Sequence, residues 1–100
     1  MIIYSVEITI KKDVAQKWLH WMQTHHIPDV MNTGLFIEFD FFQNLFKPLT
    51  YTIQYKLKNT DHYSKYRELY AGNLQKEHSR KFENKFSAKR KMFTHLDLDD

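Results

Sequence analysis

Apolar and polar residues alternate along the first ten positions of the chain. Every second residue from Ile2 to Ile10 is apolar, while Glu7 lies among the polar residues between them. A period of two predicts a strand with one apolar face and one mixed face. The same alternation over residues 50–57 predicts a second strand of this kind.

The segment after the first strand has helical spacing. Its apolar stripe consists of Val14, Trp18, Met22 and His25 or His26. Asp13 is a candidate cap at its start. Because Pro28 disfavours helical geometry at the residue before it, the helix is predicted to end near His26. Asp29 is then a candidate cap for a further short turn, and Gly34 suits a left-handed exit from that turn.

A second helical segment follows the caps offered by residues 59–61. Its predicted inward stripe is Tyr63, Tyr66, Tyr70, Leu74 and His78. A last strand is then predicted from Phe86, Ala88, Arg90 and Met92, ending before the acidic residues Asp97, Asp99 and Asp100.

Residues 35–46 are typical of a strand that is rich in phenylalanine. Phe41 and Phe42 interrupt strict alternation, which predicts a bulge or full burial at that point. Lys47 and Pro48 end the segment, so a hairpin to the strand at residues 50–57 is the simplest connection.

The order of elements is therefore β-α-β-β-α-β over one domain, residues 1–100. This order is typical of the ferredoxin-like α+β sandwich, a four-stranded antiparallel sheet with two helices on one face. The first strand is predicted to be central, in agreement with its unbroken apolar face.

The sheet face without helices has a mixed composition. It is predicted to collect Ile3, Ser5, Glu7, Thr9, Thr52 and Gln54. Together with the phenylalanine-rich strand, such a face favours packing against a second copy. The resulting homodimer would enclose the polar positions as a cavity between the sheets, suited to a small, largely apolar ligand. A dimer interior filled by side chains, with only a structural or interaction role, is the alternative.

The amino-acid composition limits the cellular compartment and the kinds of chemical site that we expect. The chain has no cysteine, which excludes disulfides, thiol catalysis and cysteine-based zinc sites and is consistent with a reducing compartment. No signal peptide and no apolar run of membrane-spanning length is evident. We therefore expect a cytoplasmic protein that has no membrane partner.

The net charge of +3 is unevenly distributed, because residues 76–91 hold seven Lys or Arg against two Glu. This run is typical of a solvated helix end and a lysine-protected edge strand, although it would also attract phosphates. A nucleic-acid-binding module with this strand and helix order is the alternative function. Residues 51–56 lack the glycine-aromatic pattern of RNA-recognition strands, so nucleic acid is the weaker interpretation.

Several motifs resemble a family of short proteins of unknown function. They are residues 18–22 (WLHWM), 26–31 (HIPDVM), 33–36 (TGLF), 52–55 (TIQY) and 77–82 (EHSRKF). That family is grouped with the dimeric α+β barrels, which include antibiotic-biosynthesis monooxygenases, stress-responsive barrel proteins and haem-degrading enzymes. The resemblance implies the fold and a homodimer, and it assigns no reaction. By analogy with the haem-degrading relatives it leaves haem binding by His78 open, and otherwise no cofactor is expected.

Three residues are candidates for acid–base chemistry. His26 and His78 are both predicted at one end of the sandwich, where imidazoles titrate near neutral pH, or else form structural bonds to backbone or Asp29. Glu7 is unusual in a central strand, and it either pairs with Arg90, Gln54 or Thr52 or has a raised pKa.

Ligand-binding candidates are Trp21, Gln54 and Arg90, whereas Trp18 is predicted to belong to the core. Trp21 lies toward the edge of the first helical stripe, where it either lines a pocket mouth or dimer contact or simply packs. No metal site is predicted, because His25 and His26 are adjacent rather than four residues apart.

Overall fold

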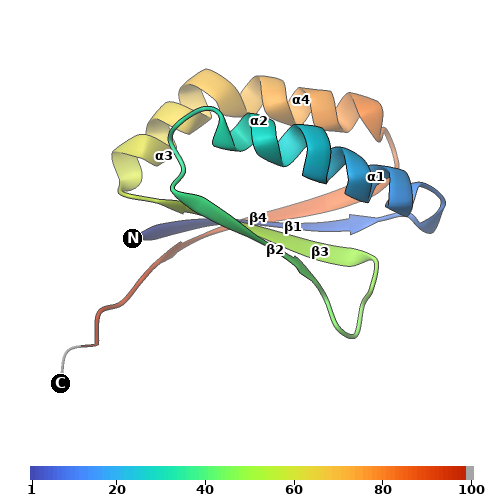
Figure 1. The fold of residues 1–100 in the computed structure, drawn as a ribbon, viewed down its shortest axis with the longest axis horizontal. Helices are drawn as coiled ribbons and strands as arrows, with labels where there is room; N and C mark the ends of the chain where they lie inside the picture. The colour runs from blue at the N-terminus through green and yellow to red at the C-terminus, as the bar shows by residue number, and fades with distance from the viewer. Residues whose placement is uncertain (99–100) are drawn as a thin grey trace.

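An antiparallel sheet covered on one face by two long helical segments makes up the fold (Figure 1). The computed structural model describes residues 1–98, and Asp99 and Asp100 of the acidic tail lie outside the described residues. The elements are β1 (Ile2–Ile10), η1 (Lys12–Val14), α1 (Ala15–Trp21), η2 (Met22–His26), α2 (Ile27–Met31), β2 (Glu38–Gln43), β3 (Thr50–Leu57), α3 (Thr60–Tyr66), η3 (Arg67–Ala71), α4 (Gly72–Lys81) and β4 (Phe86–Thr94).

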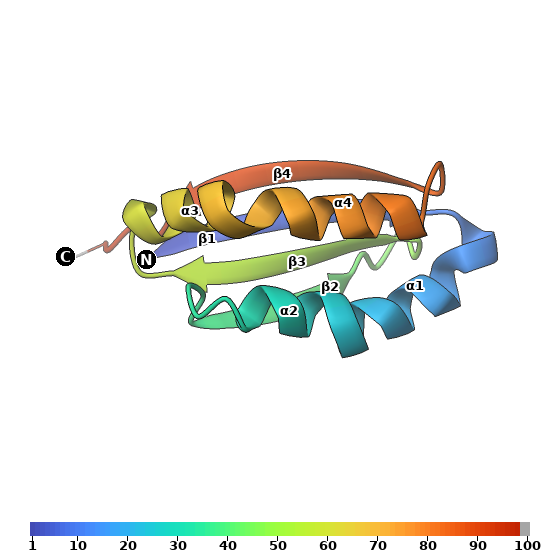
Figure 2. The ribbon, with the colours of Figure 1, turned by 90° about the horizontal axis from the view of Figure 1, so that it is seen from above.

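The strand order β2-β3-β1-β4 places β1 at the centre, as predicted. All three neighbouring pairs are antiparallel, which confirms the ferredoxin-like arrangement. Seen from above, the continuous helix α1-η2-α2 runs along the β2 and β3 side, and α3-η3-α4 runs along the β1 and β4 side (Figure 2). The opposite face of the sheet is bare, and we call it the open face.

Alternate residues of the strands and the inner sides of both helices form the core. The largest fully buried side chains are Trp18, Ile10, Met22, Ile27, Ile53, Leu57 and Val30. Removing each such side chain from water contributes about 1.5–3 kcal/mol to folding. The strand periodicity predicted this face of the sheet correctly.

The first helix does not end near His26, contrary to the prediction from Pro28. It continues through η2, a π-helical turn in which the Ile27 N–H bonds to the Met22 carbonyl, and Ile27 keeps helical angles of −61° and −45°. Pro28 directly follows this π turn, at the start of α2, so the wider turn comes where a proline would disrupt regular α-helical bonding. Asp29 therefore caps nothing, whereas Gly34 has the expected positive φ of 77°.

The second helix starts as predicted, since the Asn59 side chain accepts a hydrogen bond of 3.0 Å from the His62 N–H. Its inward stripe is wrong at one position. The π turn η3 inserts an extra residue per turn, so Tyr70 is 39% exposed while Ala71 is buried in its place. Tyr66 and His78, on either side of this turn, are buried as predicted.

The phenylalanine-rich strand is shorter and more regular than predicted. β2 pairs with β3 in unbroken register, so Phe41 and Phe42 point to opposite faces and form no bulge. Phe42 is 50% exposed rather than fully buried. Phe36 is buried ahead of the strand, and Phe46 lies beyond it in the β2–β3 loop, 89% exposed.

The open face has the predicted composition. Register places Ile3, Ser5, Glu7 and Thr9 beside Thr52, Gln54 and Lys56 on one side and beside Ser87, Lys89, Lys91 and Phe93 on the other. The outer strand β2 adds Glu38, Asp40 and Phe42. Among residues 1–98, no helix has the length and apolar character needed to cross a membrane.

Candidate functional site

A small cavity lies between the sheet and the two helices. Its volume is about 40 Å³, more than one buried water requires and far less than a typical ligand pocket of several hundred Å³. It adjoins an open groove of about 280 Å³ between α3-η3-α4 and β4. Tyr4, Tyr66, Gln75 and Arg90 line both spaces, so the groove and the cavity are direct neighbours.

Two histidines from different helices meet at the cavity. His26 comes from η2 and His78 from α4, and their ring centroids are 5.6 Å apart. The Trp18 indole donates a hydrogen bond of 2.9 Å to Nε2 of His78. Because an indole N–H can only donate, Nε2 of His78 carries the lone pair, and the proton of its neutral ring is on Nδ1. In residues 1–98, Nδ1 of His26 is buried without a hydrogen-bond partner.

Burial keeps both imidazoles neutral at physiological pH. It lowers the pKa of His26 to about 4, an effect that Asp29 opposes and Arg90 reinforces. Burial likewise lowers the pKa of His78 to about 4, with the other histidine and Arg90 adding to the shift. Each neutral ring has one N–H donor and one acceptor nitrogen, and because Trp18 occupies the acceptor of His78, that ring offers the cavity only its Nδ1–H.

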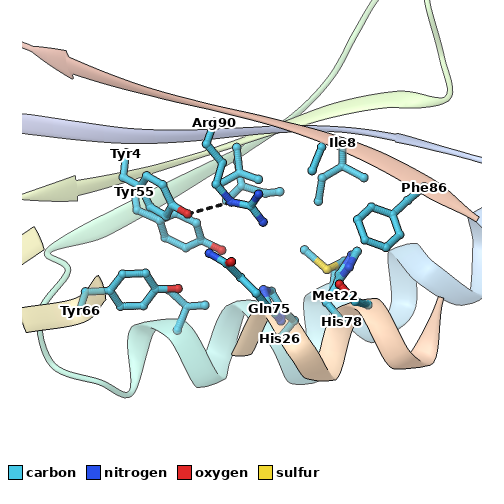
Figure 3. A pocket seen from close by; sticks show the side chains of 15 residues that line it. Tyr4, Ile8, Met22, His26, Tyr55, Tyr66, Gln75, His78, Phe86 and Arg90 are labelled. Carbon is cyan, nitrogen blue, oxygen red and sulfur yellow. Dashed lines mark hydrogen bonds between the residues drawn. The ribbon is translucent and has the colours of Figure 1, made fainter. Parts of the chain in front are cut away.

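Arg90 brings the positive charge. It lies on β4, and its Nε donates a hydrogen bond of 3.2 Å to the Tyr4 hydroxyl (Figure 3). The Arg90 guanidinium extends from the sheet toward Gln75, and His78 and Met22 lie farther from the arginine. In the described part of the chain, no carboxylate forms an ion pair with Arg90, and no Asp or Glu lines the cavity.

Tyrosine rings form the wall on the other side. Tyr4 packs against Tyr55 and Tyr66 with ring centroids 6.0 Å and 5.9 Å apart. Burial raises the pKa of all three hydroxyls, most strongly for Tyr55 and Tyr66. These phenols therefore remain neutral and present hydroxyl groups inside a largely aromatic wall.

The predicted site residues separate onto the two faces of the sheet. His26, His78 and Arg90 come together at the cavity. Glu7 and Gln54 lie on the open face, where Glu7 stands opposite Thr52 and Lys89, so its suggested pairing with Arg90 is wrong. Adjacent strand residues point to opposite faces, and this parity separates Glu7 from Arg90.

Trp21 has a packing position. It is 7% exposed, and its ring lies 5.3 Å from that of His26 and 5.5 Å from that of Phe82. Trp21 thus packs against His26 and does not line the cavity itself.

Sequence reasoning missed Tyr4, Tyr55 and Gln75 as members of the site. The tyrosines occupy apolar-face strand positions, where a hydroxyl in place of Ile or Val is the one signal that marks them. Gln75 has no such signal, because the extra residue in η3 changes which side of α4 faces the sheet.

The site does not fit a haem or a metal ion. Nε2 of His78 is engaged by Trp18, and the cavity is far smaller than a porphyrin. Within residues 1–98, no three His, Asp or Glu side chains gather in a way that would hold a metal.

A family model matches residues 1–96, nearly the whole chain. The chain belongs to the DUF4286 family, a domain of unknown function. No curated protein matches the sequence.

Solved structures with the same fold are numerous and distant in sequence. One is SnoaB, a cofactor-independent oxygenase from Streptomyces nogalater, with a TM-score of 0.73 and 11% identity over 97% of this chain and 94% of that one. A dimeric ferredoxin-like protein from an uncultured marine organism matches with a TM-score of 0.74 and 10% identity, over 100% and 99% of the chains. An antibiotic biosynthesis monooxygenase matches with 0.70 and 9%, over 97% and 100%. At these identities the likeness establishes the fold alone.

Proposed function

We propose that this DUF4286 chain is a homodimeric binding protein that takes a small molecule into the space between its sheet and its helices. The cavity and its adjoining groove are the observation that carries this proposal. A second ligand space between the sheets, as expected from the sequence, would exist only in the assembled dimer. The interior of each protomer already holds the histidines and the arginine.

Self-association is supported by apolar side chains on the open face. Phe42 and Phe93, near its two edges, are 50% and 46% exposed. The β2–β3 loop and the C-terminal segment both project beyond this face of the sheet (Figure 1). They carry Leu45, Phe46, Leu96 and Leu98, each at least 71% exposed. A second copy would cover these side chains, which are costly to leave in water.

Charge favours one orientation of the two copies. The open face carries Glu38 and Asp40 on the edge strand β2, and Lys89 and Lys91 on the opposite edge strand β4. Glu38 also pairs with Lys56 of β3 at 2.6 Å, so among residues 1–98 Asp40 carries the unpaired acidic charge of its edge. A two-fold axis parallel to the strands would stack β2 of one copy over β4 of the other. Each acidic edge would then face a basic edge, which gives an interface that is complementary to itself.

Charge reversal tests this dimer. Lys89→Glu/Lys91→Glu and Glu38→Lys/Asp40→Lys should each raise the dimer dissociation constant at least tenfold, and an equimolar mixture should recover dimers. Sedimentation velocity measures both results, with Arg80→Glu, a charge reversal on the outside of α4, as the control. Wild-type protein that remains monomeric at high micromolar concentration would refute the dimer.

Ligand binding is tested by closing the groove. Gly72 lines it in ordinary helical geometry, and a Cβ built there meets no atom within 4 Å. Gly72→Leu should therefore fold and fill the groove, while Ser64→Leu, on the exposed side of α3, is the matched control.

Ligand-observed NMR with neutral and anionic single-ring aromatic compounds provides the measurement. Binding to the wild type and to Ser64→Leu, lost in Gly72→Leu, is the expected result. If no compound binds, the structural-subunit alternative is favoured. If Gly72→Leu binds as well as the wild type, the groove is not the binding place and the proposal is refuted. Retention of single-stranded RNA that weakens with salt would instead favour the nucleic-acid alternative.

A further inference from the structure

The charge balance of the cavity is one-sided. Its lining contains the guanidinium of Arg90 and, in the described residues, no carboxylate at all. The adjoining groove adds a second arginine, Arg67, again without an acidic residue. Arg90 is exposed, so its guanidinium is accessible from solvent, and within residues 1–98 no carboxylate competes with an incoming anion for it.

Two side chains at the cavity offer hydrogen-bond donors to a ligand, His78 and Arg90. His78 accepts from Trp18 through Nε2, which leaves its Nδ1–H as a donor. The Nε–H of Arg90 donates to the Tyr4 hydroxyl, and its terminal amino groups can donate to another partner. The unpartnered Nδ1 of His26 belongs to the same wall.

We infer that the cavity binds the carboxylate of a small organic acid, with Arg90 as the principal contact and the acid's apolar body in the groove between α3-η3-α4 and β4. This inference rests on the proposed function and names its ligand class. A carboxylate is planar and has two oxygens, which matches the fork of a guanidinium and needs little volume beyond it. A cavity of about 40 Å³ has room for such a group but for nothing much larger.

The groove is suited to the rest of such a molecule. Its helical side is lined by the rings of Tyr63 and Tyr66 and by the small residues Ala71 and Gly72, which leave space for a ligand. Aromatic walls favour a flat or aliphatic apolar body, which would slide inward until its acid group meets Arg90. The acid would thus enter with its charged end first.

The test compares each acid with its own amide. Benzoate, phenylacetate and hexanoate, each beside the corresponding neutral amide, are titrated into the isotope-labelled protein, and affinities are read from amide shifts of cavity residues. Each acid that binds should do so at least tenfold more tightly than its amide. The imidazole pKa values of His26 and His78 should also rise on binding, because a carboxylate stabilises their charged forms.

Variants of one strand supply the controls. Arg90→Gln should abolish the preference for the acid, and Arg90→Lys should retain only part of it, because lysine keeps the charge but loses the fork. Lys89→Gln removes the same charge from the neighbouring position on the open face and should leave the preference unchanged.

The outcomes separate this inference from the proposed function. If the amides bind as well as the acids and Arg90→Gln changes nothing, the carboxylate assignment is overturned, while ligand binding in the cavity stands. If none of the six compounds binds and neutral fragments also fail, both are overturned. An equal loss of acid preference in Lys89→Gln would contradict the role of Arg90 and point to general surface charge.

Discussion

The two faces of the sheet consist of alternate residues of the same strands, yet they differ in their surroundings and in their roles. On β1, Tyr4 and Ile8 point toward the helices, while Glu7 and Thr9 point away. On β4, Arg90 faces the cavity, and its neighbours Lys89 and Lys91 face the open side. The covered face stabilises the protomer and contains the candidate site. The open face contributes little to the protomer and is available for a second copy.

This difference explains why neighbouring residues of like chemistry need not share a function. Arg90 and Lys89 carry the same charge and are adjacent in sequence, but the pleat separates them by the full thickness of the sheet. Only Arg90 lies beside the histidines and tyrosines that line the cavity. Substitutions on each face can measure how completely the two faces are separated.

The largest expected effect is on the stability of the protomer. Ile53→Ala on the covered face should lower the free energy of unfolding by about 2–5 kcal/mol, because it removes buried contacts and enlarges a cavity. Thr52→Ala on the open face should change it by less than about 0.5 kcal/mol. Urea denaturation followed by tryptophan fluorescence measures both.

If Ile53→Ala fails to fold, Ile53→Val serves in its place, with an expected loss of about 0.5–1.5 kcal/mol. Equal losses in the free energy of unfolding at positions 52 and 53 would mean that the open face stabilises the protomer as much as the covered face does.

Lowering the pH is expected to have an effect of intermediate size on the free energy of unfolding. The pKa of His26 and of His78 is about 4 in the folded chain against 6.5 when unfolded. Between these values the unfolded chain binds more protons, so stability falls as pH drops from about 6.5 toward 4. Each imidazole should contribute a slope of up to about 1.4 kcal/mol per pH unit. Asp29 opposes this shift, whereas Arg90 and the other histidine reinforce it.

Denaturation at pH 7, 6 and 5 measures this slope before most carboxylates titrate. His26→Gln should make the dependence on pH shallower, whereas His20→Gln, at an exposed position on α1, should leave it unchanged. A wild-type stability that does not fall between pH 6.5 and 5 would contradict the neutral, buried histidine pair.

The smallest effect is expected at Glu7, the most unusual residue in the sequence. Because Glu7 is exposed on the open face, Glu7→Gln should change the free energy of unfolding by no more than about 0.5 kcal/mol. It should also leave acid binding in the cavity unchanged, as measured by the same NMR titration. A loss of acid binding would show that the two faces are coupled, for example through the dimer.

The sequence by itself determined the strands, their faces and the order of elements. Period-two alternation in β1 and β3 depends only on local pleat geometry, so Val6 and Ile53 could be assigned to the core without a structure. The same parity placed Glu7 and Gln54 on the uncovered side. Local chemistry likewise predicted the Asn59 cap and the left-handed Gly34.

Two features required the tertiary structure: which side of each helix faces the sheet, and which residues form the candidate site. The π turns η2 and η3 each insert a residue, which carries the first helix through to Pro28 and replaces Tyr70 by Ala71 on the inner side. Such turns are rare in helices, so a regular helical period does not predict them. The meeting of His26, His78 and Arg90 arises from three separate elements, so its chemistry became visible only once the helices were docked over the strands.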